Sequence, residues 1–495
     1  MANSIHINNP LEGNKHDSSP TTIKFGENKL EENKRREWLK YKKPHVYNKV
    51  IQFNDKLARG EGVPIIQFQY NYECNFKCEH CSIEKFQMTR KEEKESGRRY
   101  FNMDDVRELS KQADEMGIST FVITGGEPLI FRDFDELVEA IDPNKFWIVS
   151  DTNGWNLDDE RAKHLKEIGV DKIQLSLDGV DATTHDQFRR QAGSWERVMR
   201  AIEACKKNDL HVILSTVVWK SRAQSEEFLQ YLELAKKLGV GTYVSYAKPV
   251  GAYEGRYDQM VTAEDEAYLK ELEKKYDVFT HLTPSYGMDI GCIAVKRILP
   301  ITRYGDVMPC PYIHVSLGNF FEESLKEIID RGLNLNWFNP KVKMPCVCGV
   351  DRSFIDQVVV PSYGDVQVPV HYTEIFSAED YVNPEKEKTL GLGCNTGGCS
   401  CGSNTKSGNS NNKDQIIETI ETKDGVIPIT WAPPEDTRYK HKLEGEPEYI
   451  KDQSKPLKLW DAPSNIKDRE GKLHYQRKGN AKANQNAGHI INSAE

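Results

Sequence analysis

Three cysteines stand close together in the stretch YECNFKCEHCSI, at positions 74, 78 and 81. In a reducing compartment, clustered thiols favour metal ligation over disulfides. A structural zinc site takes four ligands, usually from two CxxC pairs, whereas Cys74, Cys78 and Cys81 have no fourth partner nearby in the sequence. Three thiolates can hold a four-iron, four-sulfur cluster and leave one iron open to a ligand. The spacing therefore indicates a cluster with a reactive iron, with structural zinc as the plainer alternative.

A second motif, ITGGEPL, supplies Gly125, Gly126 and Glu127 at the end of a β-rich run. Glycines let the backbone approach a ligand closely, and a carboxylate accepts charge-assisted hydrogen bonds from an ammonium group. On its own, a Gly-Gly-Glu tripeptide is more often a turn. Its position, one strand after the cysteines, favours a binding role.

Further polar side chains follow the next apolar runs. They are Ser150, Asn153, Ser176, Asp178 and Arg189. Short polar side chains suit sugar hydroxyls, and an arginine can form a bidentate pair with a carboxylate. Asn-Gly and Asp-Gly are also ordinary turn residues that close strands, so both interpretations stay open. A neighbouring histidine, His185, is expected to cap a helix or lie on the surface rather than act as a ligand.

The elements that must position these residues alternate between strand and helix. Six β-rich runs cover residues 65–70, 120–126, 146–154, 172–179, 211–219 and 242–251. Amphipathic segments with helical periodicity separate them, for example 103–117 and 194–208. Such alternation implies a parallel sheet with right-handed crossovers. We predict an α/β fold with a partial (βα)6 TIM-like barrel, whose loops after the strands carry the chemistry.

The order of these motifs, CxxxCxxC after the first strand and GGE after the second, resembles that of radical S-adenosylmethionine (radical SAM) enzymes. The resemblance implies that the cluster on Cys74, Cys78 and Cys81 is catalytic. It also implies that S-adenosylmethionine (SAM) binds the open iron and that reduction cleaves it to a 5'-deoxyadenosyl radical. The GGE segment would bind the amino group of SAM, and Arg189 its carboxylate. The cofactor-binding set that the resemblance implies is His80, Gly125, Gly126, Glu127, Asn153, Ser176 and Arg189.

Seven more cysteines lie towards the C-terminus, at positions 292, 310, 346, 348, 394, 399 and 401. The run from Cys292 through GDVMPCPYIHVSLGN resembles the opening of SPASM and twitch domains, which bind auxiliary iron-sulfur clusters. Three interpretations remain open: two auxiliary 4Fe-4S clusters using Cys292, Cys310, Cys346, Cys348, Cys394, Cys399 and Cys401; one cluster on the first four; or zinc and unused thiols. The remaining cysteine, Cys205, is expected to be a small core residue.

Composition divides the chain into five parts. We predict an N-terminal helical and polar extension (1–62), the barrel (63–251), a connecting helical segment (252–288), a small Cys-rich α+β auxiliary-cluster domain (289–401), and a flexible linker with a largely disordered, irregular tail (402–495).

Charge and hydropathy argue against some partners. A net charge of -9 does not favour a broad nucleic-acid surface. The sequence has no run of 18 apolar residues, and its first twenty residues lack the apolar core of a secretory signal. We therefore expect a cytoplasmic protein with neither a nucleic-acid nor a membrane partner.

The resemblance implies an oxidoreductase that abstracts hydrogen from a substrate, with an electron donor such as a flavodoxin or ferredoxin. Post-translational modification of a peptide or protein is the leading hypothesis. Radical tailoring of a small molecule, such as a tetrapyrrole or another cofactor precursor, is the alternative. A non-catalytic iron-sulfur electron-transfer protein and a zinc-stabilised binding module are hypotheses of other classes.

Overall fold

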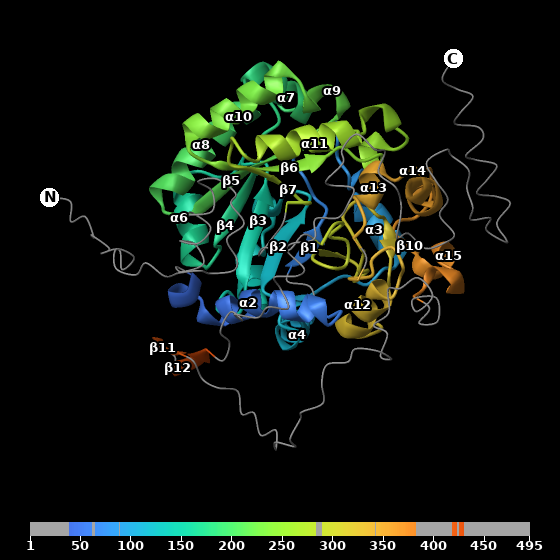
Figure 1. Ribbon diagram of the computed structural model, residues 1–495. Coiled ribbons are helices and arrows are strands. Elements are labelled where there is room, and N and C mark those ends of the chain that lie inside the picture. Colours follow the sequence, from blue (N-terminus) through green and yellow to red (C-terminus); the bar gives the residue numbers. More distant parts are fainter. Residues whose placement is uncertain are drawn as a thin grey trace, which may run out of the picture.

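The computed structural model describes residues 39–61, 65–88, 90–283, 290–341, 343–382, 418–422 and 425–429. Its centre is one curled sheet of eight strands in the order β7-β6-β5-β4-β3-β2-β1-β8, and every neighbouring pair is parallel. Helices surround the outside of the sheet (Figure 1). The predicted α/β half-barrel is therefore confirmed.

Six strands match the predicted runs. They are β1 (Ile65–Asn71), β2 (Thr120–Gly125), β3 (Trp147–Thr152), β4 (Lys172–Ser176), β5 (His211–Val218) and β6 (Gly241–Tyr246). The other two, β7 (Val278–Thr280) and β8 (Leu299–Thr302), were not predicted. Both are too short to show a period, and Pro300 within β8 argues against a strand. An edge position tolerates proline, and β8 is the edge strand beside β1.

The two faces of the sheet differ in burial. Ile66 and Phe68 of β1 are fully buried beneath the helices, whereas Gln67 between them is half-buried. The same alternation recurs along β2 and β4. We call the face that carries Gln67 the inner face. Because successive side chains of a strand point to opposite faces, the outer face forms the core, and the inner face is left with polar, partly accessible groups.

Helices α4 (Met103–Glu115), α5 (Phe134–Ile141), α6 (Asp159–Glu167), α8 (Ser194–Lys207) and α10 (Glu226–Leu238) supply the other half of this core. Their starts follow capping chemistry. Asn102 accepts hydrogen bonds from the first turn of α4, Asp158 does so for α6, and Ser225 for α10. Two more helices flank the barrel, α2 (Pro44–Ala58) before β1 and α11 (Ala263–Leu272) after β6.

Residues 290–382 form the Cys-rich region with little regular structure. Its elements are β8, β9 (Val315–Ser316), α12 (Leu325–Leu333), α13 (Val347–Val350), α14 (Arg352–Phe354), β10 (Val370–His371) and α15 (Tyr372–Ile375). The buried apolar side chains of this region belong to the same continuous core as those of the barrel. Its helices α13, α14 and α15 lie together along one side of the sheet (Figure 1).

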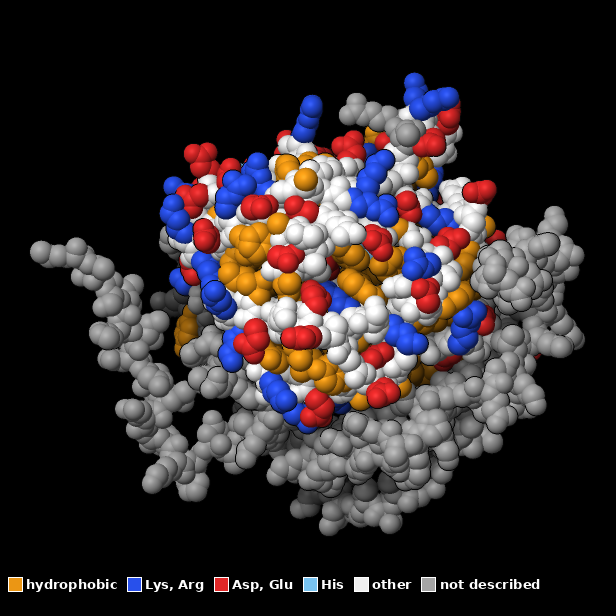
Figure 2. Space-filling model, turned by 90° about the horizontal axis from the view of Figure 1, so that it is seen from above, with side chains coloured by type: hydrophobic (Ala, Val, Ile, Leu, Met, Phe, Trp, Pro, Cys, Tyr) orange, Lys and Arg blue, Asp and Glu red, His pale blue; other side chains and the backbone are white. Residues whose placement is uncertain are grey.

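Beyond residue 382 the structure describes only β11 (Glu418–Thr422) and β12 (Gly425–Ile429), which pair antiparallel. Cys394, Cys399 and Cys401 lie outside the described residues, as do most of the predicted linker and tail. No helix of the described ranges combines the length and the hydropathy that crossing a membrane requires. Figure 2 shows acidic and basic side chains interspersed over one face, so the net negative charge is not concentrated there.

Candidate active site

The loop that carries Cys74, Cys78 and Cys81 begins where β1 ends, and its first residues are fixed by the end of β2. The Gly126 N–H donates to the carbonyl of Asn71 over 2.8 Å, and the Glu127 N–H donates to that of Glu73 over 2.8 Å. A Cβ on Gly126 would lie 1.8 Å from the Glu73 oxygen. Gly125 has a φ of +126°, which also excludes most side chains. The two glycines therefore let β2 approach the start of the cysteine loop, a role that the sequence did not indicate.

The far end of the loop is fixed in the same way by a residue that the sequence analysis missed. The Ala252 N–H donates to the Cys81 carbonyl over 2.9 Å. Gly251, beside it, has a φ of +60°, and a Cβ there would lie 2.3 Å from the Cys81 oxygen. In the sequence, Gly251 marks only the end of a strand. The structure shows that glycine contacts hold the cysteine loop at both ends.

Glu127 is buried, and its carboxylate connects the ends of β2 and β3. Its Oε1 accepts hydrogen bonds from the Leu129 N–H (3.1 Å) and the Thr152 hydroxyl (2.5 Å), and its Oε2 accepts from the Asn153 N–H (2.7 Å). Burial raises the pKa of this carboxyl against the effect of those donors. The side-chain amide of Asn153 in turn donates to Asn75 in the cysteine loop over 2.8 Å. Glu127 and Asn153 therefore position the loop whatever else they bind.

Arg189 reaches the cysteine loop from the end of α7 (Ala182–Arg189). Its guanidinium donates to the Cys78 sulfur over 3.6 Å and forms an ion pair with Asp178. The Asp178 carboxylate also accepts from the Val217 N–H over 2.8 Å. Burial opposes ionisation of Asp178, but Arg189, together with His80, Arg222 and the Val217 N–H, outweighs it and holds the pKa of that carboxyl well below its usual range. In this structure Asp178 therefore partners Arg189, the arginine predicted to bind a ligand carboxylate.

His185 does not lie where the sequence predicted. It is 1% exposed, and its Nδ1 accepts a hydrogen bond from the Asp178 N–H over 3.1 Å. The helix cap is Asp181 instead, which accepts from the Thr184 N–H. The expectation of a capping or surface histidine is wrong because its ring points under the strand end and supports the residue that pairs with Arg189.

His80 packs in a column of rings beside Cys81. Its ring stacks on Phe188 at 4.7 Å, and Phe188 stacks on Trp219 at 5.0 Å. Burial, followed by the charge of Arg189, lowers the pKa of His80 to about 4, which keeps the ring neutral. Ser176 ends β4 in register with Ser215 and is half-buried. The structure thus brings the residues predicted to bind SAM to one end of the sheet, next to the cysteine loop.

The donor set of the loop fits an iron-sulfur cluster. The thiols are half-buried, and Cys74 interacts electrostatically with Cys78 and Cys81. Burial raises the pKa of Cys74 to about 12 and that of Cys81 to about 11, so their thiolates need a nearby metal charge. Within the described ranges, no three His, Cys, Asp or Glu side chains are placed to hold a single metal ion. Three thiolates from one loop can hold a four-iron, four-sulfur cluster and leave one iron open to a ligand.

Four other cysteines, separated by up to 56 residues, gather in the Cys-rich region. Cys292, Cys310, Cys346 and Cys348 are all at most 8% exposed. Cys348 interacts by hydrogen bonding with both Cys346 and Cys310, and Cys292 interacts with Cys346. The geometry therefore agrees with the interpretation that these four form one auxiliary ligand set. The other three thiols of the two-cluster interpretation lie outside the described residues.

Lys248 projects from the end of β6 into this group of thiols. Its ammonium donates to the Tyr246 carbonyl over 3.0 Å. A Cβ on Gly349 would lie 2.8 Å from the Cys346 sulfur and 3.3 Å from the Lys248 Nζ, so thiol and ammonium face the same glycine. Burial lowers the pKa of Lys248, but the Cys346 and Cys348 thiols outweigh it and raise the pKa. The sequence analysis did not single out this lysine.

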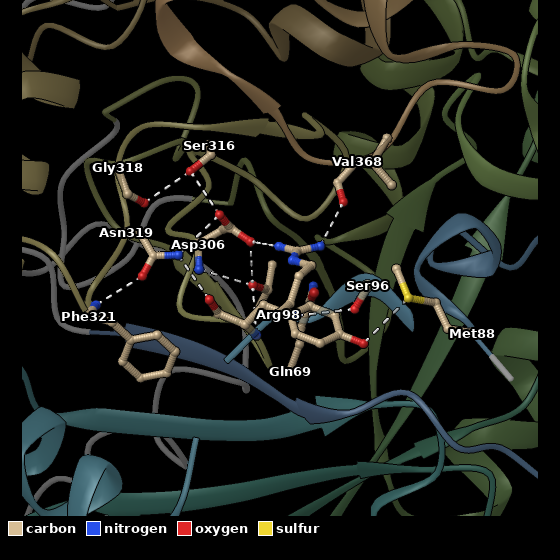
Figure 3. A network of polar contacts seen from close by, with 12 residues as sticks. Gln69, Met88, Ser96, Arg98, Asp306, Ser316, Gly318, Asn319, Phe321 and Val368 are labelled. Carbon is tan, nitrogen blue, oxygen red and sulfur yellow. Dashed lines mark hydrogen bonds and ion pairs between the residues drawn. The ribbon is translucent and has the colours of Figure 1, made fainter. Parts of the chain in front are cut away.

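The cysteine loop and the Cys-rich region are also linked through a half-buried ion pair. Arg98, in the segment that follows the loop, pairs with Asp306 and donates to the Val368 carbonyl over 3.5 Å (Figure 3). Asp306 further accepts from Asn319 over 3.3 Å and from Ser316 over 3.4 Å. The Cys-rich region is therefore anchored to the polypeptide next to the cysteine loop.

Comparisons with known proteins agree with this geometry. A model of the radical SAM superfamily matches residues 70–235, and one of the SPASM iron-sulfur cluster-binding domain matches residues 292–353. A probable GTP 3',8-cyclase of Saccharolobus solfataricus is 30% identical over 288 residues, which cover 55% of this chain and 87% of the relative. The chain belongs to the radical SAM superfamily. The radical SAM match contains the cysteine loop, and the SPASM match contains the four gathered cysteines and ends before Cys394.

Other proteins similar to this chain include a heme synthase and a structure that holds a precursor peptide. An AdoMet-dependent heme synthase of Methanosarcina barkeri is 26% identical over 321 residues, covering 58% of this chain and 87% of the relative. The crystal structure of Streptococcus suis SuiB bound to the precursor peptide SuiA shares 17% identity, covers 56% of this chain and 67% of that one, and has a TM-score of 0.44. The chain is an enzyme that uses SAM and iron-sulfur clusters, which argues against a non-catalytic electron carrier and a zinc module.

The inner face of the barrel holds two acceptors without partners. Among the described residues, the buried Oδ1 of Asp151 and Oε1 of Gln67 have no hydrogen-bond partner, although the Asp151 carboxyl as a whole also interacts with Thr124 and Lys172. The register runs from Gln67 through Val122 to Val149, two residues before Asp151, so both acceptors share one face. Burial raises the pKa of Asp151 to about 7. Neither residue was predicted, because the signal for Asp151 is one acidic residue inside an apolar run.

Proposed function

We propose that this radical SAM enzyme abstracts a hydrogen atom from a C–H bond of a peptide or protein and so carries out a post-translational modification. The bound cofactors supply the 5'-deoxyadenosyl radical at the loop of Cys74, Cys78 and Cys81. The polypeptide has to hold that loop, orient SAM and the substrate, and exclude water. Hydrogen-atom abstraction needs no general acid or base, so the site requires no catalytic triad.

Each predicted SAM contact keeps its proposed role. The GGE segment takes the amino group of SAM, since a free lone pair of Glu127 remains beside Asn153. Arg189 takes the carboxylate of SAM while Asp178 fixes its orientation. Asn153 and Ser176 are assigned to the ribose, and His80 lines the site through its stack on Phe188.

The observation that supports a peptide substrate is the pair of hydrogen-bond acceptors on the inner face, Asp151 Oδ1 and Gln67 Oε1, that have no partner among the described residues. A buried oxygen without a hydrogen bond is costly, so a bound substrate is expected to donate to it. Backbone amides, ammonium and guanidinium groups of a peptide are such donors. A substrate rich in carboxylates would instead bring like charge to Asp151, whose Oδ1 has no partner.

The test is an anaerobic assay with reductant and SAM, offering either a peptide library or iron coproporphyrin III. We expect peptides to stimulate 5'-deoxyadenosine formation and to change in mass. With an active peptide, Asp151→Asn should raise KM by up to about tenfold, because asparagine keeps an acceptor oxygen but loses the charge that strengthens its hydrogen bond, while SAM cleavage without substrate stays unchanged. Turnover of the porphyrin with none of the peptides would contradict the proposal.

The second candidate is a tetrapyrrole substrate, which the sequence relatives favour. Besides the heme synthase, a pre-heme d1 synthase of Dinoroseobacter shibae is 26% identical over 176 residues. The two candidates predict opposite effects of one variant. Asp151→Asn should weaken the binding of a donor-bearing peptide and strengthen the binding of a carboxylate-rich tetrapyrrole. The reason is that the substitution removes the negative charge of Asp151 from the inner face.

The remaining assignments complete the proposal. Catalysis resides in the barrel (63–251), the auxiliary cluster in residues 289–401, and the segments 1–62, 252–288 and 402–495 extend or connect them. A cytoplasmic flavodoxin or ferredoxin supplies the electron. Nucleic acids and membranes are not partners in this scheme.

A further inference from the structure

Lys248 is a buried cation whose charge no carboxylate balances at close range. It is 5% exposed, and among the described residues no acidic side chain lies within ion-pair distance of its ammonium. The ammonium lies 4.9 Å from the ring centre of Tyr246 and 5.4 Å from that of Tyr312. Glu266 on α11 interacts with Lys248 electrostatically from farther away. Burying an ammonium group without an anion costs desolvation free energy. We therefore expect a negatively charged group next to Lys248.

The negative group that the structure offers is the set of four cysteines. Gly349 separates Lys248 from Cys346, and a methyl group there would contact both side chains, at 3.3 Å and 2.8 Å. The lysine comes from the end of a barrel strand, whereas the thiols come from the Cys-rich region. A glycine at the contact lets the two regions approach until the charge lies next to the sulfur.

We propose that Lys248 is a positioning residue of the auxiliary iron-sulfur cluster, which offsets the negative charge of the Cys346 and Cys348 thiolates and raises the reduction potential of that cluster. A cluster with four thiolate ligands is anionic and becomes more negative when reduced. A fixed cation beside it in a medium of low dielectric constant stabilises the reduced form more than the oxidised form. This role does not depend on which substrate the enzyme modifies.

The test uses the full chain with all clusters reconstituted under anaerobic conditions. Lys248→Met removes the charge and keeps the length of the side chain, whereas Lys248→Arg keeps the charge. The readouts are iron and sulfide content and a redox titration followed by electron paramagnetic resonance. We expect the midpoint potential of the auxiliary cluster to fall in Lys248→Met and to stay near wild type in Lys248→Arg. The catalytic cluster in the same molecule is the internal control, and its potential should not move.

A second variant probes the contact without touching the lysine. Gly349→Ala should push the ammonium away from Cys346 and lower the auxiliary potential in the same direction by a smaller amount. If Lys248→Met loses the auxiliary iron while Lys248→Arg retains it, the charge is required and the proposal holds.

Three results would overturn it. They are an unchanged auxiliary potential in Lys248→Met at full iron content, equal shifts or equal iron loss in the Met and Arg variants, and an equal shift of the catalytic cluster. None of these readouts uses a substrate. A wrong assignment of the modified molecule would therefore leave this test intact, and failure here would leave the proposed function standing.

Discussion

The two groups of cysteines are built in opposite ways. The cysteine loop, which we propose to be the catalytic loop, draws three half-buried thiols from residues 74–81, and contacts at Gly126 and Gly251 hold its ends. The auxiliary group draws four buried thiols from residues 292–348, so long loops must close before they meet. The first group is specified by local sequence, and the second by the packing of a whole region. A reactive centre needs access, whereas an auxiliary one is enclosed.

Their cations differ as well. Arg189, at the end of α7, contacts Cys78, but its charge is paired with that of Asp178, just after β4. Lys248 contacts no carboxylate among the described residues, and its charge is available to the thiols. A carboxylate therefore orients Arg189 beside the cysteine loop and balances its charge. The charge of Lys248 beside the auxiliary cysteines is balanced by no carboxylate among the described residues.

Removing a ligand from each group gives the largest contrast. Cys78→Ala should reduce 5'-deoxyadenosine formation to background, because the cluster loses one of three thiolates. Cys310→Ala should keep part of the cleavage and lose the modified product, and Cys205→Ala should keep both, since that thiol is a buried core residue. Chromatography of the nucleoside products checks this. Cleavage by Cys78→Ala would remove the central assignment.

Glycine substitutions should give the second-largest effect and should affect one group of cysteines at a time. Gly126→Ala forces a Cβ to 1.8 Å from the Glu73 oxygen, and Gly291→Ala forces one to 2.4 Å from the Met344 oxygen, beside Cys292. Each should lose the iron of its own cluster and keep the other, as iron content and resonance spectra would show.

The matched control is Gly97→Ala. Gly97 has a φ of +62°, close to that of Gly291, but nothing lies within 4 Å of its Cβ position. It should cost only the backbone strain, on the order of 1 kcal/mol, and retain both clusters. Loss of iron in this control would show that strain rather than the contact decides.

Asp178→Asn tests the ion pair that balances the charge of Arg189 beside the cysteine loop. It leaves Arg189 buried without its partner, which should lower the free energy of unfolding by about 3–5 kcal/mol. Auxiliary iron should be unaffected. The midpoint of thermal unfolding, measured by circular dichroism against Asp159→Asn at the surface, checks the result. Equal midpoints for the two variants would mean that Arg189 finds another partner.

A pH effect at the junction of the two regions should be the smallest. His314 contacts Phe86, just after the catalytic loop, at 4.9 Å between ring centres. Burial, followed by the charge of Lys85, lowers the pKa of His314 from its usual 6.5 to about 4. The folded state disfavours the charged ring. The contribution of His314 to the free energy of unfolding is therefore complete above pH 6.5 and is lost as the pH falls towards 4.

His314→Phe should therefore flatten the stability profile between pH 6.5 and 4, by up to about 3 kcal/mol. Thermal unfolding of both proteins across this range is the measurement. A parallel displacement of the two profiles would indicate a change in packing rather than the loss of a titrating group.

The sequence predicted what short segments determine. Six strands, most helices and the two motifs of the catalytic side were readable because each occupies a few consecutive residues. The reasons were less visible: Gly126 accommodates Glu73 rather than a ligand, and His185 supports Asp178 from beneath. Lys248 and Asp151 could not be predicted, since a single charged residue in an apolar run acquires meaning only when the sheet curls and brings a partner, or leaves it without one.

The pairing of β8 with β1 has a consequence for any shortened form of the protein. β8 lies in the Cys-rich region, yet it is hydrogen-bonded along the strand that leads directly into the catalytic loop. A chain ending before Leu299 would expose the backbone N–H and C=O groups of β1 as an open edge, a template for pairing with a second molecule. The Cys-rich region therefore covers the open edge of the barrel sheet. Its removal is expected to cause aggregation instead of yielding an isolated catalytic domain.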